Sequence, residues 1–250
     1  MTPEVVILRC GSDNYSYLIL SGDEAVAVDT SDAATVNNAL KIRGLKLSMI
    51  LSTHHHADHT GGNEKLHRQT GCTVAGADRR ITACTAILAD NENITVNGHA
   101  IVCMHLPGHT NGSCAFYLPG TQSLFTGDTL FYAGCGRLFE CTASTMHHSI
   151  RRIMTLPAET HIYAGHEYTL DNLDFARSVE PSNNDVVQRK RLVEKTLRQQ
   201  GMYGPSTLET ELATNPFMRT GSHAIRSTLH MSECSDEAVL AELRERKNRF

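Results

Sequence analysis

Short apolar runs separated by Gly, Asp and Asn occupy the first two thirds of the chain. Runs of this length, bounded by such residues, are typical of strands. The predicted strands are Val5–Leu8, Tyr15–Leu20, Ala25–Val28, Met49–Leu51, Ala100–Leu106, Cys114–Leu118, Ser123–Thr126 and Ile162–Ala164. Between them, apolar residues recur at helical spacing within 36–40 and 146–154, and Thr142 or Ser144 is a suitable N-cap for the second helix. Strands mixed with helices predict a layered α/β body.

The pattern changes near residue 171, where strand-like runs stop and polar helical periodicity begins. A helix is predicted over residues 183–200, ended by Gly201, with Val187, Leu192, Val193, Thr196 and Leu197 on one face. A second is predicted to begin after Ser235, since a hydroxyl cap and an acidic first turn satisfy exposed N–H groups. We therefore expect an α/β domain over residues 1–170 and a smaller all-α domain over residues 171–250.

Composition excludes several classes of protein. The 250 residues are 40% hydrophobic and 20% charged, which is too apolar for a disordered chain. The formal charge of −4 argues against binding to nucleic acid or to an anionic membrane. The eight cysteines contain no C-x-x-C pair. We expect neither a secretory leader nor a transmembrane helix, because Glu4 is acidic, the apolar run after it is short, and no stretch approaches ~20 apolar residues. We expect a cytoplasmic, monomeric protein, with a mitochondrial isoform as an open alternative.

Four potential metal ligands follow the fourth predicted strand within six residues. They are His54, His56, Asp58 and His59. Because side chains alternate in an extended segment, His54 and His56 can point to one side while His55 points away. Asp58 and His59 come at the turn into the next helix, so one short segment can offer three imidazoles and a carboxylate to a single cavity.

Three later strands also end in a residue that can bind a metal. These residues are His109, Asp128 and His166, each preceded by a glycine that permits a tight turn. Their shared position at strand ends, together with the first cluster, predicts a binuclear metal centre. Imidazole and carboxylate ligands suit Zn²⁺, the metal we expect, and also Fe or Mn.

The spacing Thr53-His54-x-His56-x-Asp58-His59, followed by the three later residues, resembles the metallo-β-lactamase-fold hydrolases. In that family's arrangement, His54, His56 and His109 would hold the first metal ion. Asp58, His59 and His166 would hold the second, and Asp128 would bridge both. The resemblance implies an αββα sandwich.

Further motifs resemble one branch of that superfamily, the glyoxalase II (hydroxyacylglutathione hydrolase) family. They lie within residues 13–15, 134–140, 165–173, 215–219 and 244–247. The family has the αββα sandwich followed by a smaller helical domain that closes over the substrate. Two positions near the expected site depart from the family: Ser113 replaces a usual His and Cys141 a usual Gly.

The resemblance implies hydrolysis of S-D-lactoylglutathione to glutathione and D-lactate, the second step of methylglyoxal detoxification. Two metal ions would share a hydroxide that attacks the thioester carbonyl, and Asp58 would orient it. The resemblance also implies that Arg137 and Tyr168 contact the glutathione peptide and that Arg244 and Lys247 pair with its glycine carboxylate. From spacing alone, Arg244 and Lys247 would form a solvated helix face.

Three other functions compete with this interpretation. A mononuclear-iron persulfide dioxygenase of the same fold is the alternative enzyme, but that group lacks the helical domain. A metal-dependent nuclease would need a basic, aromatic-rich groove, which the sequence does not indicate and which the formal charge of −4 disfavours. A non-enzymatic binding module would be expected to have lost metal ligands. The identity of the thiol carrier, glutathione or trypanothione, and the range of acyl groups stay open.

Overall fold

The computed structural model describes residues 3–96 and 98–250. The chain divides into two compact units, each built from separate segments. Unit 1 comprises Met1–His105, Gly112–Gly127 and Tyr163–His166, and unit 2 comprises Leu106–Asn111, Asp128–Ile162 and Glu167–Phe250.

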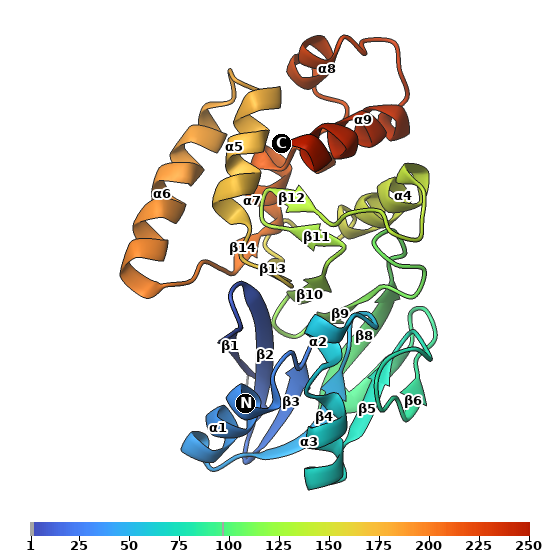
Figure 1. Cartoon of the computed structure of the whole chain (residues 1–250), viewed down its shortest axis with the longest axis vertical. Coiled ribbons are helices and arrows are strands. Elements are labelled where there is room, and N and C mark those ends of the chain that lie inside the picture. Colours follow the sequence, from blue (N-terminus) through green and yellow to red (C-terminus); the bar gives the residue numbers. More distant parts are fainter. Residues whose placement is uncertain (1–2, 97) are drawn as a thin grey trace. The chain divides into compact units, whose positions relative to one another are not determined.

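Unit 1 contains a six-stranded sheet in the order β1-β2-β3-β4-β5-β6. Its strands are β1 (Glu4–Cys10), β2 (Asn14–Ser21), β3 (Glu24–Val28), β4 (Lys46–Leu51), β5 (Thr73–Gly76) and β6 (Ala86–Ile87). The first three strands pair antiparallel, and β3 to β6 pair parallel. Helices α1 (Ala33–Arg43) and α3 (Asn63–Thr70) pack their apolar side chains on this sheet, with Val36 and Leu66 fully buried (Figure 1).

A second sheet of unit 1 runs in the order β13-β10-β9-β8-β7. Its strands are β7 (Asn93–Val96), β8 (His99–His105), β9 (Cys114–Leu118), β10 (Ser123–Gly127) and the end of β13 (His161–Ala164). Tyr17 of β2 joins the two sheets, because its ring lies edge-on to Phe125 and Tyr163 with centroids 5.2 and 5.3 Å away. Two sheets with helices outside form the layered α/β body.

Unit 2 is mainly helical. Its elements are β11 (Leu130–Phe131), β12 (Gly134–Cys135), α4 (Ala143–Ile153), the start of β13, α5 (Thr169–Val179), α6 (Asn184–Gln200), β14 (Ser206–Thr207), α7 (Leu208–Thr214), the 3₁₀ turn η1 (Pro216–Met218), α8 (His223–Leu229) and α9 (Asp236–Arg249). Helices α5 and α6 lie side by side, and α9 packs on α4 and η1 (Figure 1). The predicted α/β class with a helical C-terminal part is confirmed. The predicted boundary at residue 171 stays a prediction.

All eight predicted strands occur, with bounds shifted by a few residues. The predicted caps also occur: Thr142 caps α4, Ser235 caps α9, and Gly201 ends α6 in the left-handed region at φ 73°. The sequence analysis missed β5 and β7, which are only four residues long, and the two-residue strands. Segments this short show too few residues for an alternating pattern to emerge.

One prediction for α6 is wrong. Leu192 was expected to share one face with Val193, but Leu192 is 56% exposed whereas Val193 is buried. The other buried residues of this helix are Val186 and Arg189. A buried arginine defines the inner face because it has a charged partner, and apolar periodicity alone does not reveal that partner.

That partner is Glu211 of α7, which is fully buried and forms an ion pair with Arg189. The second carboxylate oxygen of Glu211 accepts hydrogen bonds from the Ala133 amide at 2.8 Å and from Asn215 Nδ2 at 3.2 Å. The Arg189 guanidinium also donates to Ser206 Oγ at 3.0 Å. One ion pair therefore connects α6, α7, β14 and the β11–β12 hairpin.

The segment Asn215–Arg219 serves the folding of unit 2. Asn215 caps η1 and donates to the carbonyls of Phe131 and Gly134 at 3.2 and 3.0 Å. Arg219 binds the Glu180 carboxylate through two nitrogens at 2.8 and 2.9 Å. Burial by itself raises the pKa of Glu180, but hydrogen bonds from Arg219, Ser222 and Asn183 outweigh it and hold this pKa below its usual value.

Among the described residues, every helix is too short or too polar to cross a membrane.

We expect Glu211→Gln to lower the free energy of unfolding of unit 2 by about 3 kcal/mol, because it leaves the Arg189 charge buried without its counter-ion. Chemical denaturation followed by circular dichroism measures this. The control is Glu245→Gln, whose side chain is 59% exposed and pairs loosely with Arg249; it should change stability by less than about 0.5 kcal/mol. Equal losses in both variants would contradict the role given to the buried pair.

Candidate metal centre

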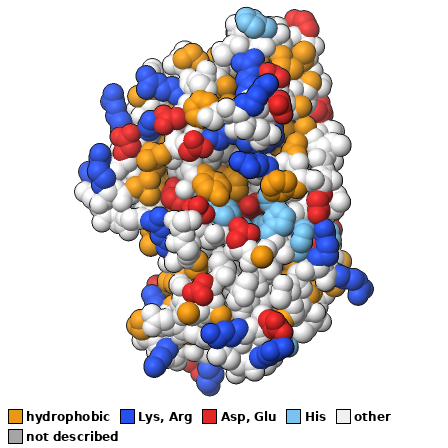
Figure 2. All heavy atoms as spheres, viewed as in Figure 1, with side chains coloured by type: hydrophobic (Ala, Val, Ile, Leu, Met, Phe, Trp, Pro, Cys, Tyr) orange, Lys and Arg blue, Asp and Glu red, His pale blue; other side chains and the backbone are white. Residues whose placement is uncertain are grey.

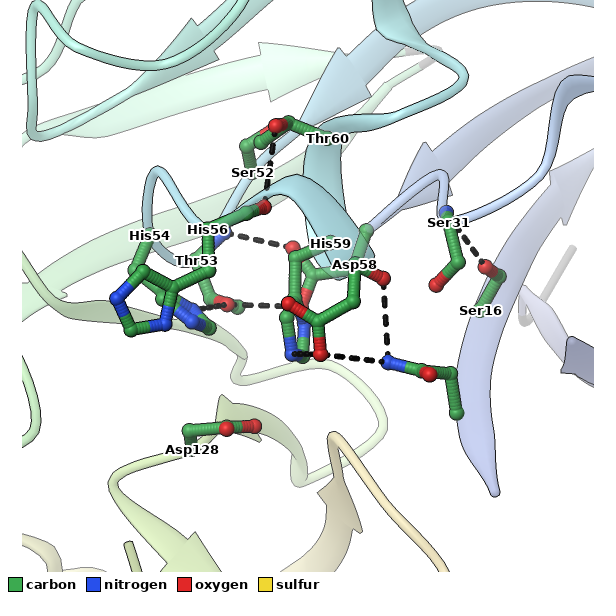
Figure 3. Close-up of polar contacts among 12 residues, drawn as sticks. Ser16, Ser31, Ser52, Thr53, His54, His56, Asp58, His59, Thr60 and Asp128 are labelled. Carbon is green, nitrogen blue, oxygen red and sulfur yellow. Dashed lines mark hydrogen bonds and ion pairs between the residues drawn. The ribbon is translucent and has the colours of Figure 1, made fainter. Parts of the chain in front are cut away.

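The loop after β4 brings three histidines and an aspartate together (Figure 3). The backbone bends at Thr53 and His54 and is extended at His56, which precedes the short helix α2 (Ala57–Thr60). The His54 ring centroid lies 4.7 Å from that of His56 and 4.2 Å from that of His59. His55 turns away, with Nδ1 3.5 Å from the Asp78 carboxylate.

Asp29 orients this loop from the end of β3. It is 2% exposed, and its carboxylate accepts hydrogen bonds from the Thr53 amide (2.8 Å), the Thr53 hydroxyl (2.7 Å) and His59 Nδ1 (2.9 Å). Because a carboxylate only accepts hydrogen bonds, Nδ1 of His59 carries the proton and Nε2 carries the lone pair. A metal-binding histidine is usually oriented in this way.

His166, after β13, is also oriented by a hydrogen bond from its Nδ1 to a carboxylate. Its Nδ1 lies 3.0 Å from the Asp13 carboxylate, so its Nε2 also carries a lone pair. The segment around Asp13 is fixed to β13 because the Tyr15 amide donates to the Gly165 carbonyl at 2.8 Å. Asn14 Nδ2 donates to Asp58 Oδ2 at 3.2 Å and lies 3.4 Å from His166 Nε2.

Three ligand atoms of unit 1 converge as a result. His59 Nε2 lies 3.2 Å from His166 Nε2, and Asp58 Oδ2 lies 3.6 and 3.3 Å from these two nitrogens. When both imidazoles are neutral, two lone pairs at this separation repel unless a proton or a metal ion lies between them. Ligands about 2.05 Å from a tetrahedral ion are roughly 3.3 Å apart. The donor set and its spacing therefore fit a divalent metal ion.

Unit 2 carries the other two predicted ligands close together. His109 Nε2 lies 3.5 Å from Asp128 Oδ2, and the Arg137 carbonyl accepts from His109 Nδ1 at 2.9 Å. Gly136 allows this approach: a Cβ there would lie 2.0 Å from the Asp128 carbonyl oxygen and 3.0 Å from His109 Nδ1. The Phe139 ring lies edge-on to His109 at 5.1 Å.

The predicted ligands thus fall into two groups. His54, His56, Asp58, His59 and His166 lie in unit 1, and His109 and Asp128 lie in unit 2. That all seven form one binuclear centre stays a prediction. Histidine side chains reach the surface on the face drawn in Figure 2. Among the ligands of unit 1, Asp58 is exposed and His56 is half-buried, whereas His54, His59 and His166 are buried.

Three groups that orient ligands were not predicted in that role: Asp13, Asp29 and the Arg137 backbone carbonyl. Asp13 lies in one of the motifs noted from the sequence, and Asp29 follows a predicted strand directly, which is the signal that marked the ligands themselves. The Arg137 backbone carbonyl carries no side-chain signal, so sequence reasoning had no means of finding it.

The predicted substrate-binding residues all lie in unit 2. Arg137 is exposed, and Tyr168, at the start of α5, is 38% exposed with its ring against Phe131 at 5.4 Å. Both side chains are open to solvent. Their contact with a substrate stays a prediction.

Arg244 and Lys247 of α9 do not form a solvated helix face, so that alternative is wrong. Arg244 is 6% exposed and donates to the Cys135 carbonyl at 2.6 Å, with its guanidinium over the Phe217 ring. The Lys247 side chain is 8% exposed and pairs with Asp171. Burial lowers the pKa of the Lys247 ammonium, although Asp171 opposes the shift. Their role toward glutathione stays a prediction.

Comparison with known proteins gives matches over both parts of the chain. Residues 11–166 match the model of the metallo-β-lactamase superfamily, and residues 167–250 match that of the hydroxyacylglutathione hydrolase C-terminus. Among solved structures, a B3 metallo-β-lactamase, BLEG-1, is 22% identical with a TM-score of 0.67, covering 86% of this chain and 99% of its own. ETHE1 from Myxococcus xanthus is 23% identical with a TM-score of 0.67, covering 99% and 98%. These structures support the fold.

Curated relatives indicate to which family of this superfamily the chain is most similar in sequence. The hydroxyacylglutathione hydrolases of Brucella ovis and Brucella abortus are each 39% identical to this chain over 252 aligned residues, which cover 99% of this chain and 98% of the relative. The resemblance noted from the motifs is therefore confirmed. The chain belongs to the hydroxyacylglutathione hydrolase family, within the metallo-β-lactamase superfamily.

Proposed function

We propose that this protein hydrolyses 2-hydroxyacyl-glutathione thioesters, with S-D-lactoylglutathione as the main substrate, to glutathione and D-lactate. The observation that carries the proposal is the full-length match to hydroxyacylglutathione hydrolases, which includes their C-terminal part. That C-terminal match favours the thioesterase over a mononuclear-iron persulfide dioxygenase, which was expected to lack this part.

We propose further that the seven ligands hold two divalent metal ions. Zn²⁺ is the metal we expect, and Fe and Mn are the alternatives. His54, His56 and His109 would hold one ion, Asp58, His59 and His166 the other, and Asp128 both. Chain connectivity supports this, because Asp128 follows Gly127, the last residue of β10 in unit 1, by a single peptide bond. When bound, such a pair lowers the pKa of a coordinated water and polarises a carbonyl oxygen.

Asp58 is the catalytic residue in this proposal. Asn14 donates to its Oδ2 at 3.2 Å, and the side chain is 49% exposed, so the carboxylate is held at one oxygen yet reachable by water. The carboxylate would accept a hydrogen bond from the attacking water and orient it toward the thioester carbonyl. A thiolate leaves readily, so no strong general acid is required.

Cationic groups of unit 2 would hold the peptide part of the substrate. Glutathione carries two carboxylates, and Lys247 and Arg244 lie three residues apart on α9. Arg137 and Tyr168 would contact the peptide nearer the metal ions.

We propose a reducing compartment, the cytoplasm, because glutathione and eight free cysteines both suit it. A monomer that binds neither nucleic acid nor membrane is part of the same proposal.

Chelation gives a direct test. Purified protein should cleave S-lactoylglutathione, followed as loss of thioester absorbance, and dialysis against dipicolinate should abolish the activity. Restoring Zn²⁺ should recover it, since the chelator removes the ions and leaves the fold. Full activity in the metal-free protein would contradict the proposal, and so would oxygen uptake on glutathione persulfide without thioester cleavage.

Asp13→Ala should weaken metal binding about tenfold, because His166 loses the carboxylate that fixes its orientation. Competition with a chromophoric chelator measures the affinity without relying on turnover. Asp23→Ala is the matched control, since Asp23 pairs with Lys46 at the surface and should leave the affinity unchanged. Unchanged affinity in Asp13→Ala would show that the Asp13 contact does not support the site.

A further inference from the structure

The ammonium of Lys247 already has an anionic partner within the chain. Lys247 Nζ pairs with Asp171 Oδ2 and donates to the Asp171 carbonyl at 3.2 Å. The Phe175 and Phe250 rings lie beside it, with their centroids 5.6 and 5.1 Å from Nζ. The ammonium is thus enclosed by two aromatic rings and one carboxylate.

The two members of this pair differ in exposure. The Lys247 side chain is 8% exposed, whereas the Asp171 side chain is 67% exposed. Releasing the pair would let the Asp171 carboxylate return to water at little cost. The Lys247 ammonium would be less stable without a carboxylate, because the two ring faces offset only part of the cost of burying its charge. A carboxylate arriving from solution can therefore replace Asp171 as the anionic partner of the Lys247 ammonium.

Asp171 belongs to α5, and Lys247 and Arg244 belong to α9. Arg244 Nε donates to Asn248 and Nη1 donates to the Cys135 carbonyl, which fixes the guanidinium in place. Because Lys247 follows Arg244 by one helical turn, a carboxylate that reaches both cations meets Asp171 as its competitor.

We propose that Asp171 is a specificity-determining residue: its carboxylate competes with the substrate's terminal carboxylate for Lys247 and so weakens selection for thiol carriers that end in a free carboxylate. This inference rests on the proposed function. In the wild-type protein, Asp171 partly neutralises Lys247 before either substrate binds. We therefore expect only a moderate difference in KM between a glutathione thioester and the same thioester with its glycine amidated.

The test compares these two substrates at pH 7. In Asp171→Asn, KM for S-lactoylglutathione should fall about fivefold, the size expected for freeing one partly exposed ion pair, while KM for the glycine amide stays unchanged. Glu242→Gln is the matched control, since Glu242 lies on the same helix as Lys247 but pairs with Arg246. It should change neither KM.

A second arm asks whether the effect passes through Lys247. In a Lys247→Met background, Asp171→Asn should no longer lower KM. An unchanged or raised KM in Asp171→Asn overturns the inference, because Asp171 would then be neutral or would position Lys247 for the substrate. An equal fall for both substrates also overturns it.

Binding of S-methylglutathione by calorimetry separates this inference from the proposed function. A wild-type protein that cleaves neither thioester refutes the proposed function. Calorimetry then still decides the role of Asp171: tighter binding to Asp171→Asn than to wild type supports the competition, and equal or weaker binding overturns it.

Discussion

Two imidazole lone pairs aimed at one point are the constraint on which the site in unit 1 depends. His59 and His166 each give their Nδ1 proton to a carboxylate, Asp29 or Asp13, which leaves the two Nε2 atoms facing each other at 3.2 Å. Such an arrangement is unfavourable by itself and favourable around a cation. Asp29 also fixes Thr53 and hence the loop that carries His54, so one buried carboxylate links strand pairing to ligand geometry.

Unit 2 depends on buried charge in a different way. Its ion pairs hold helices together around Glu211 and Glu180, and Asn215 and Arg219 bind neighbouring segments of the same unit. Two of the cations expected to meet glutathione, Arg244 and Lys247, are also engaged within the chain. Binding would therefore exchange one anion for another at Lys247, which makes selectivity sensitive to Asp171.

The features predicted correctly from the sequence are those that depend on residues close together in the chain. The strand ends carrying ligands, the caps of α4 and α9, and the end of α6 at Gly201 all follow from local chemistry. The hydrogen-bond partners of Asp29 could not be predicted, because they require β3 and β4 to pair in a register that sets Val28 beside Leu51. The pairing of Lys247 with Asp171 joins residues 76 positions apart. The exposure of Leu192 follows from a buried arginine whose partner lies on another helix.

We propose that ligands from both units complete one centre with two metal ions. Metal analysis by mass spectrometry, with wild type and Asp128→Ala loaded identically, tests this most directly. We expect two divalent ions per chain in the wild type, and loss of at least one ion together with thioesterase activity in the variant. An Asp128→Ala protein that keeps both ions and normal turnover would contradict it.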